Sequence, residues 1–234
     1  MIDILYEDDA LIAVNKPAGL AVHRSNMVRN ADEFLIDLLR EQVDGEVYLA
    51  HRLDRATSGV LLVARSRDVA AVLGEQFMER RVHKKYLAVV RGWPEPTEGL
   101  IDYPLSGAKE SGPRREARTH YQRLATTEVA IELGRYPQQR YAFVLAEPET
   151  GRFRQIRRHL AHLRHPIIGD CQHGRGDHNR LYKQYFSCHR MLLHAWKIRF
   201  AHPVSGAPIQ LEAPLDDTYL ALLQRFGWNV PGEE

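Results

Sequence analysis

The chain has 234 residues, of which 44% are hydrophobic and 26% are charged, a balance typical of globular proteins that excludes a disordered or fibrous chain. No apolar stretch approaches the roughly 20 residues that a membrane span needs, and the acidic start MIDILYEDD lacks the apolar core of a secretory signal. Two cysteines are too few for a disulfide scaffold, so we expect a cytoplasmic protein with reduced thiols.

Basic side chains are concentrated in one part of the chain. Residues 111–199 hold 17 Lys and Arg against 7 Asp and Glu, whereas the remaining residues hold 15 against 23, and the net charge is only +2. Such a segment either forms a surface that meets a polyanion, with nucleic acid the leading candidate, or is solvated charge spread over several faces. The charge distribution by itself favours neither interpretation.

The first part of the chain predicts short strands alternating with two helices. Asn30 and Glu33 resemble a capping box at the start of the first helix, and Ser66 can cap the second. The predicted elements are strands at 2–6, 11–14, 47–49 and 60–64 and helices at 30–43 and 66–80.

A polar loop leads into a buried strand at residues 51–64, HRLDRATSGVLLVA. Residues 57–59 predict a turn, because two hydroxyls can bond the backbone and glycine tolerates positive φ. Asp54 is flanked by Arg52 and Arg55, and opposite charge lowers a carboxyl pKa, so an ionised Asp54 could act as a nucleophile. The residues alone fit an ordinary ion-paired surface loop better, because structural ion pairs perturb carboxylates too.

The second part of the chain begins with KKYLAVVRG, a predicted strand with Tyr86 near its start beside Lys84. The flat ring of a tyrosine can stack on a base, although most tyrosines are core or surface residues. The further predicted elements are strands at 84–92, 118–126 and 140–147, a helix at 153–163, a hairpin at 200–212 and a helix at 217–226 after Asp216.

The helix at 153–163 is unusually basic. Ile156, Leu160 and Leu163 recur on one face. The basic residues around that face are Arg152, Arg154, Arg157, Arg158, His159, His162 and Arg164. They would repel one another without nearby anions, which could be phosphates or the carboxylate of Asp54.

Two further segments carry side chains that could bind ligands. The loop at 107–118, with Lys109, Arg114, Arg115 and Arg118, is either a contact with RNA backbone or simply solvated. The cysteines and histidines between 171 and 189 contain no CxxC pair and fit no common zinc finger, so we predict no metal site there. These residues are Cys171, His173, His178, Cys188 and His189.

Five segments together resemble the RluA-type pseudouridine synthases. The matching motifs are NKPAGLAVH, HRLD-x-x-TSG with its apolar strand, K-x-Y-x-A-x-V-x-G, TGRFRQIRRH and MLLHA, in that order. The resemblance implies an α+β fold with a mixed, mostly antiparallel sheet flanked by helices and loops and an active-site cleft across the sheet. It also implies one catalytic domain over residues 1–234 without an N-terminal S4 domain.

The resemblance assigns roles to particular residues. Asp54 would be the nucleophile, Tyr86 would stack on the target uracil, and Arg157 would pair with the aspartate. Arg154 stands where the family usually has histidine, so no role of that histidine is carried over. The residues expected to contact the substrate are His51, Arg52, Lys84, Arg152, Arg154 and Leu193.

The implied reaction detaches a uracil from its ribose, rotates it and rejoins it through C5, so no cofactor is needed. The segment RRHLAHLRHPIIGD resembles the branch of the family that modifies the tRNA uridine numbered 65 in the T-arm stem, so the expected partner is tRNA, with no membrane or protein partner. The alternatives are an enzyme of this family acting on large-subunit rRNA and a non-catalytic RNA-binding protein. An aspartate-based hydrolase would lack a positioned general acid or metal cluster.

Overall fold

Two compact units, each assembled from separate stretches of chain, make up the computed structural model, which describes residues 1–24, 33–109 and 111–232. Unit 1 contains Met1–Lys85 and His194–Pro214, and unit 2 contains Tyr86–Leu193 and Leu215–Glu234. The chain passes between the units within strands β5 and β9 and again after β10. Each unit is discontinuous in sequence, so no single cut of the chain separates them. The expectation of one catalytic domain stays a prediction.

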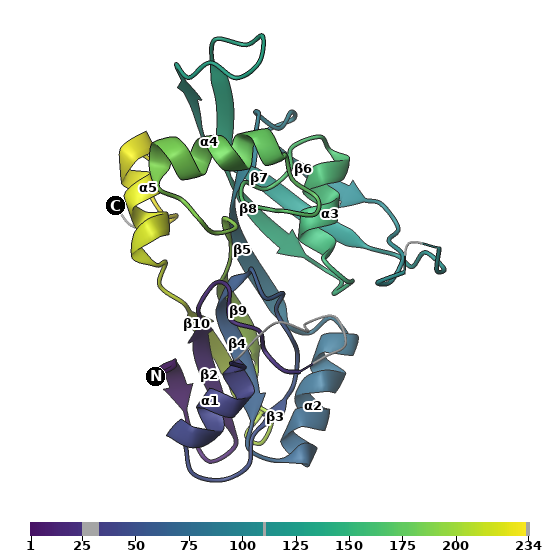
Figure 1. Cartoon of the computed structure of the whole chain (residues 1–234). Helices are drawn as coiled ribbons and strands as arrows, with labels where there is room; N and C mark the ends of the chain where they lie inside the picture. The colour runs from purple at the N-terminus through teal and green to yellow at the C-terminus, as the bar shows by residue number, and fades with distance from the viewer. Residues whose placement is uncertain (25–32, 110, 233–234) are drawn as a thin grey trace. The chain divides into compact units, whose positions relative to one another are not determined.

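Unit 1 is a small sheet with two flanking helices (Figure 1). Its strands run in the order β1-β2-β4-β9, with β3 paired to β4 and β10 paired to β9. The pairing of β4 with β9 is parallel, and the other pairings described in this unit are antiparallel. The elements are β1 (Asp3–Glu7), β2 (Leu11–Lys16), α1 (Leu35–Gln42), β3 (Tyr48–Leu49), β4 (Ser58–Ala64), α2 (Arg67–Met78), most of β9 (Leu193–Ala201) and β10 (Pro208–Glu212).

Strand β4 is the centre of the unit 1 core. All seven of its residues are buried, as expected for an apolar strand with neighbours on both sides. Val60 and Leu62 pack in one cluster with Leu73 of α2 and Phe200 of β9. The loop that carries Asp54 is therefore attached directly to the most buried strand of the unit.

Gly59 lies in a strand, not in the turn that was predicted from the sequence. The predicted turn at 57–59 is wrong, because Gly59 already pairs with Ala195 in the β4–β9 ladder. The turn lies earlier, where the N–H of Thr57 donates to the carbonyl of Asp54 at 3.0 Å. Gly59 has φ +108, and a Cβ added to it would lie 2.2 Å from the carbonyl oxygen of Ala195, so this close approach requires glycine.

Unit 2 is built on an antiparallel sheet in the order β5-β8-β7-β6 (Figure 1). Tyr86 on β5 and Tyr121 on β7 both lie opposite Ala146 of β8, so their side chains share one face. The elements are β5 (His83–Arg91) from Tyr86 onward, β6 (Glu98–Asp102), β7 (Arg118–Val129), β8 (Gln139–Pro148), α3 (Gln155–His162), α4 (Gly176–Phe186) and α5 (Asp217–Phe226).

Predicted helix caps are confirmed where the signal is local. The side chain of Ser66 accepts from the N–H of Val69 at the start of α2, and Asp216 accepts from the N–H of Tyr219 at the start of α5. Helix α5 ends at Gly227, which has φ 66. No helix within the described ranges is long and apolar enough to span a membrane.

Other helix boundaries differ from the prediction. Helix α1 begins at Leu35, and the predicted capping residue Asn30 lies outside the described residues. Helix α3 begins only after Arg154, because that residue takes a left-handed conformation with φ 52. Helix α4 was not predicted. Its first turn follows Arg175 without a side-chain cap. One of its buried side chains, Tyr182, packs against Tyr141 on β8 with ring centres 4.8 Å apart.

Replacing Gly59 by alanine should severely destabilise the protein. The added methyl group would collide with the β9 backbone in addition to the strain of positive φ, so we expect a loss of more than about 3 kcal/mol in the free energy of unfolding. Urea titration followed by circular dichroism measures it. Gly45→Ala is the matched control, because Gly45 has φ +90 with nothing within 4 Å of the added Cβ. Equal losses in the two variants would contradict a steric role for the β4–β9 contact.

Candidate active site

A buried lysine donates a hydrogen bond to the backbone of the loop that carries Asp54. Lys16 is fully buried, and its ammonium donates to the carbonyl of Arg55 at 3.1 Å and to two carbonyls of its own segment at 2.7 and 2.9 Å. Gly19 and Arg55 add two reciprocal bonds, N–H to carbonyl and Nε to carbonyl, both 2.8 Å. These bonds fix the backbone that follows the partly exposed Asp54, so Lys16 has a structural role.

His51 anchors the start of the same loop. Its Nε2 accepts a 2.9 Å hydrogen bond from the N–H of Leu62 on β4, and its ring lies 4.6 Å from the ring of Phe77. Burial lowers the pKa of His51 to about 3, and the nearby Lys84 lowers it further, so the imidazole is neutral at physiological pH. Any contact of His51 with substrate must therefore use a neutral ring. Arg52, the next residue, is exposed.

Lys84 is the predicted site residue of unit 1 that lies near His51. Its ammonium lies 6.0 Å from the centre of the Phe77 ring, the same ring that His51 contacts. Burial lowers the pKa of Lys84 to about 8, so its charge is retained at neutral pH and lost in mildly alkaline solution. Lys84 is thus a cation whose charge depends on pH close to the physiological range.

In unit 2, Arg157 forms a buried bidentate ion pair with Asp170. Nε and Nη2 of Arg157 donate to the two carboxylate oxygens at 2.7 Å each, and only 6% and 1% of the two side chains are exposed. Burial of Asp170 would raise its pKa, but the bonds from Arg157 and from the backbone of His173 and Gln172 outweigh it and lower that pKa. Both charges are therefore retained in the fold.

Asp170 was not predicted as a partner of the basic helix. The anions expected there were phosphates and Asp54, whereas the helix pairs with a carboxylate of its own unit. The signal was present in the segment HPIIGD (165–170), whose single acid closely follows the helix. Arg158 is also engaged, donating to the carbonyl and the hydroxyl of Ser106.

Hydrogen bonds between buried polar side chains attach α3 to the sheet. Nε2 of Gln155 donates to the hydroxyl of Thr119 on β7, and that hydroxyl contacts Nδ1 of His159, both at 2.9 Å. Because Nε2 of His159 lies 3.0 Å from the carbonyl of Tyr103, it must donate there, which leaves Nδ1 to accept from Thr119. Burial lowers the pKa of His159, consistent with this neutral form.

The network places α3 on the same face of the sheet as Tyr86. Thr119 lies two residues before Tyr121, and Tyr121 shares its face with Tyr86 through Ala146. The helix that carries Arg157 thus covers the face from which the Tyr86 ring projects. Two of the residues predicted to catalyse are brought to one side of unit 2.

The remaining predicted substrate contacts have defined local settings. Nε of Arg152 donates to the carbonyl of Glu116 at 2.8 Å, and the guanidinium of Arg154 lies 4.4 Å from the centre of the Phe153 ring. Leu193 is buried at the start of β9. The predicted residues therefore form one set in unit 1 and another in unit 2, and their convergence in a single cleft stays a prediction.

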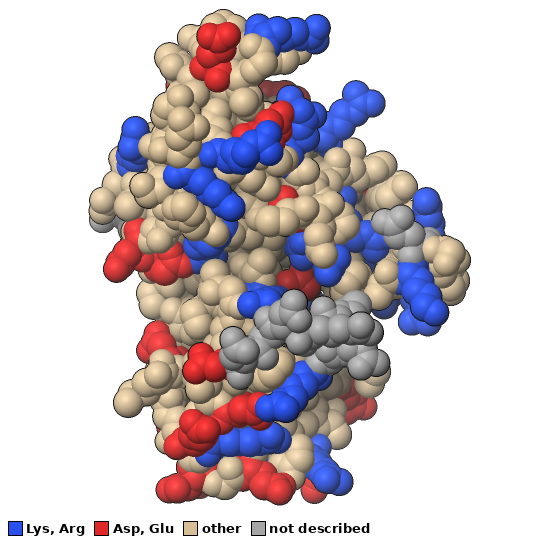
Figure 2. Space-filling view, viewed as in Figure 1, with Lys and Arg blue, Asp and Glu red and all other residues tan. Residues whose placement is uncertain are grey.

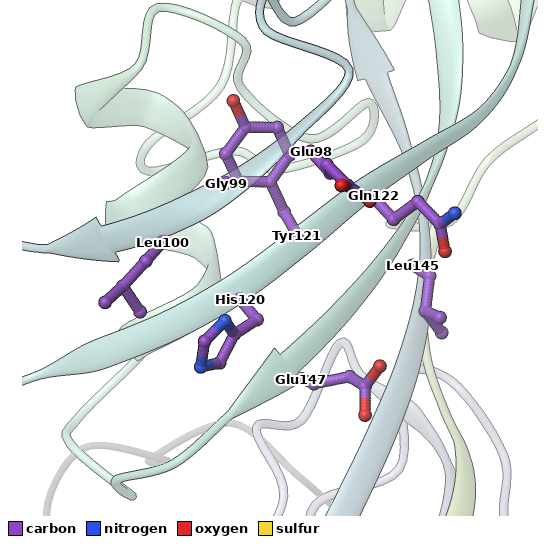
Figure 3. Close-up of a pocket in the computed structure, with 8 residues that line it drawn as sticks. All are labelled: Glu98, Gly99, Leu100, His120, Tyr121, Gln122, Leu145 and Glu147. Atoms are coloured by element: carbon purple, nitrogen blue, oxygen red, sulfur yellow. The ribbon is translucent and has the colours of Figure 1, made fainter.

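A hollow of about 340 Å³ lies on the opposite face of β6, β7 and β8 (Figure 3). Glu98 and Glu147 line it, and His120 in its wall contacts the carboxylate of Glu149 at 2.6 Å. Carboxylates repel phosphates, and none of the predicted site residues lines this hollow, so it is a poor candidate for an RNA contact.

The cysteines and histidines of the 171–189 segment are dispersed. Cys171 is exposed and Cys188 is buried, and Nδ1 of His178 lies 2.9 Å from the hydroxyl of Tyr141. Within the described ranges, no group of three or more His, Cys, Asp and Glu side chains could hold a metal ion.

Comparison with known proteins gives one consistent result. A family model described as RNA pseudouridylate synthase matches residues 10–162. The chain is 45% identical over 238 residues to tRNA pseudouridine synthase C of Salmonella typhi, covering 98% of this chain and 91% of that protein. Identity to the Vibrio cholerae protein of the same name is 44% over 238 residues, covering 98% and 97%.

Solved structures agree with the family match. The human RNA Pseudouridylate Synthase Domain Containing 4 has a TM-score of 0.73 at 25% identity, covering 98% of this chain and 95% of that one. A second human structure, RNA Pseudouridylate Synthase Domain Containing 1, has a TM-score of 0.70 at 22% identity and supports the fold alone. The predicted α+β fold class is confirmed.

Replacing Asp170 by asparagine should destabilise the protein at neutral pH by about 3–5 kcal/mol, because it removes the carboxylate that pairs with the buried Arg157. Since the folded-state pKa of Asp170 is lowered, its stabilisation is complete above the ordinary aspartate pKa of about 4 and is lost as the pH falls toward the lowered value. Urea unfolding at pH 7 and pH 3 measures both effects.

The difference between wild type and Asp170→Asn should therefore be large at pH 7 and smaller at pH 3. Asp9→Asn, at an exposed turn, is the control and should leave unfolding unchanged. A difference that is the same at both pH values would show that the charge of Asp170 is not what stabilises the pair.

Proposed function

This chain belongs to the RNA pseudouridylate synthase family, and we propose that it isomerises a uridine of tRNA to pseudouridine. Enzymes of this family are isomerases, because the product contains the same atoms as the substrate. The observation that carries the choice of tRNA is the 45% identity over nearly the whole chain to a relative named tRNA pseudouridine synthase C. The proposed target is the uridine numbered 65 in the T-arm stem.

The proposed nucleophile is Asp54. In the reaction the bond between C1′ and N1 breaks, the uracil rotates, a bond forms between C1′ and C5, the proton on C5 is released and N1 takes up a proton. A carboxylate can attack either the sugar or the ring, and both paths need an ionised acid held in one position. The bonds from Lys16 and Gly19 to Arg55 support this role, because they fix the backbone beside Asp54.

The proposed roles of Tyr86 and Arg157 are to position the substrate and the nucleophile. The Tyr86 ring would stack on the uracil, as any flat ring can. Arg157 would pair with Asp54 and orient its carboxylate. The bonds to Asp170 support this role, because they hold the plane of the guanidinium in one orientation.

The target base must leave the helix stack, at a cost of a few kcal/mol. Arg52 is exposed and could fill the space that the base vacates, with His51, Lys84 and Leu193 beside the base and with Arg152 and Arg154 on the backbone. Figure 2 shows Lys and Arg side chains gathered over the loop that follows β6, on the right of the view. These contacts would offset the cost of extruding the base.

Asp54→Asn should abolish pseudouridine formation without abolishing RNA binding. We expect the single-turnover rate on an unmodified tRNA transcript to fall by roughly 10³-fold, with the dissociation constant changed by less than about threefold. Release of tritium from uridine labelled at C5 measures the rate, and reverse-transcription mapping locates the product. Full activity of the variant would overturn the role of Asp54, and a product found only in large-subunit rRNA transcripts would overturn the choice of tRNA.

Lys84→Arg tests whether a pH-dependent cation contacts the RNA. Because the pKa of Lys84 is lowered to about 8, wild type should lose this charge between pH 7 and pH 9, and its KM for tRNA should rise several-fold, by roughly the worth of one charged contact. The arginine variant stays charged throughout, so its KM should change less. Parallel KM profiles for the two proteins would exclude Lys84 from the RNA contact.

A further inference from the structure

A basic pocket in unit 2 has no role in the mechanism above. It has a volume of about 410 Å³ and lies between α3 and the segment that follows β6. Its polar and aromatic lining is supplied by Tyr103, Ser106, Arg114, Arg158 and His173, and among the described residues no Asp or Glu lines it. A concave surface lined by two guanidinium groups favours an anionic ligand.

Tyr103 forms a rigid wall of the pocket. Its ring stacks on His162 with centres 3.8 Å apart and an interplanar angle of 18°. Its hydroxyl accepts a bond from Nη1 of Arg114 at 3.3 Å, and the Arg114 guanidinium lies 5.5 Å from the ring centre. The ring therefore restrains the otherwise exposed side chain of Arg114 at the pocket.

Arg158 on α3 is oriented by Ser106, which lies in the same segment as Tyr103. Its two terminal nitrogens donate to the carbonyl and hydroxyl of Ser106 at 2.7 and 3.0 Å. A guanidinium has five N–H groups, so these bonds hold the plane of the group and leave donors for another acceptor. Both bonded atoms of Ser106 are uncharged, so the positive charge of Arg158 is not neutralised by them.

His173 supplies the independent observation. Its Nε2 is buried and has no hydrogen-bond partner, an arrangement that is destabilising unless an acceptor or a water is present. Burial of the ring is the largest cause of its lowered pKa, and neighbouring arginines act in the same direction. The imidazole is therefore neutral and can donate from Nε2 to a ligand oxygen.

The position of Arg114 is set by the base of its loop. Leu105 and Arg115 exchange two backbone hydrogen bonds of 2.9 Å, which join the two ends of the loop. Arg114 lies immediately beside this pair and lines the pocket, whereas the side chain of Arg115 does not line it. Two adjacent arginines thus differ in whether they reach the pocket.

We propose that this pocket binds a phosphate of the RNA backbone, at a nucleotide other than the target uridine. Arg114 and Arg158 would donate to the phosphate oxygens, and Nε2 of His173 would donate a third bond. The proposal rests on the proposed function, since it assumes an RNA substrate. It adds a substrate-binding subsite that positions the RNA and takes no part in the chemical step.

Arg114→Gln and Arg115→Gln form a matched pair that removes the same charge from the same loop. We expect Arg114→Gln to raise the KM for tRNA about tenfold, with kcat unchanged, because it removes a phosphate contact. It should also reduce the slope of log binding constant against log salt by about 0.7–0.9, the value for one phosphate. Arg115→Gln should change KM less than about twofold.

His173→Phe is a second variant, which removes the buried donor and keeps the ring volume. It should raise KM and the dissociation constant for tRNA several-fold with kcat unchanged, as expected for one lost hydrogen bond to a charged group. Thermal unfolding of each variant identifies any loss of folding. If His173→Phe does not fold, the arginine pair alone decides the outcome.

The failure of this proposal is distinguishable from the failure of the proposed function. Filter binding measures the affinity for tRNA and so tests the phosphate subsite even if no pseudouridine forms. Product mapping in wild type tests the activity alone. Equal effects of Arg114→Gln and Arg115→Gln on tRNA binding would overturn the subsite. Uridine monophosphate serves as a small probe. Micromolar binding that Arg114→Gln abolishes, with tRNA binding unchanged, would assign the pocket to a free nucleotide and also overturn it.

Discussion

The buried ion pair between Arg157 and Asp170 is the interaction on which the organisation of unit 2 depends. A guanidinium that is only 6% exposed keeps its charge, so leaving it without a partner would strongly destabilise the fold, and the carboxylate supplies two bonds in one plane. The same carboxylate accepts from the backbone of Gln172 and His173, so the pair also ties α3 to the segment before α4. One interaction thus sets both the orientation of the arginine and the path of the chain after the helix.

Unit 1 also contains a buried cation. Lys16 is fully buried, and its ammonium donates to three backbone carbonyl oxygens. Because these carbonyls belong to the backbone, the bonds fix the geometry of the loop, whereas Asp170 fixes the Arg157 side chain. The bonds of Lys16 thus stabilise the loop that carries Asp54, and the ion pair with Asp170 orients Arg157. Both Asp54 and Arg157 are proposed to act in catalysis.

The basic character of residues 111–199 is partly used within the fold. Arg157 pairs with Asp170, and His159 is neutral because it accepts from Thr119 and donates to Tyr103. The cations that remain for RNA are fewer than the net charge of the segment suggests. Some of them lie in the loop after β6, over which Figure 2 shows Lys and Arg side chains gathered.

Local sequence patterns determined the helix caps at Ser66 and Asp216, most of the strands and the motifs that identify the family, because each depends on residues close together in the chain. Tertiary structure alone decided that Gly59 is a strand residue, since the reason is the backbone of β9 far along the chain. It also decided that Asp170 neutralises Arg157, because the choice of counterion depends on which segments pack together. Burial, and not spacing, selects such partners, so composition could reveal the basic helix but not its anion.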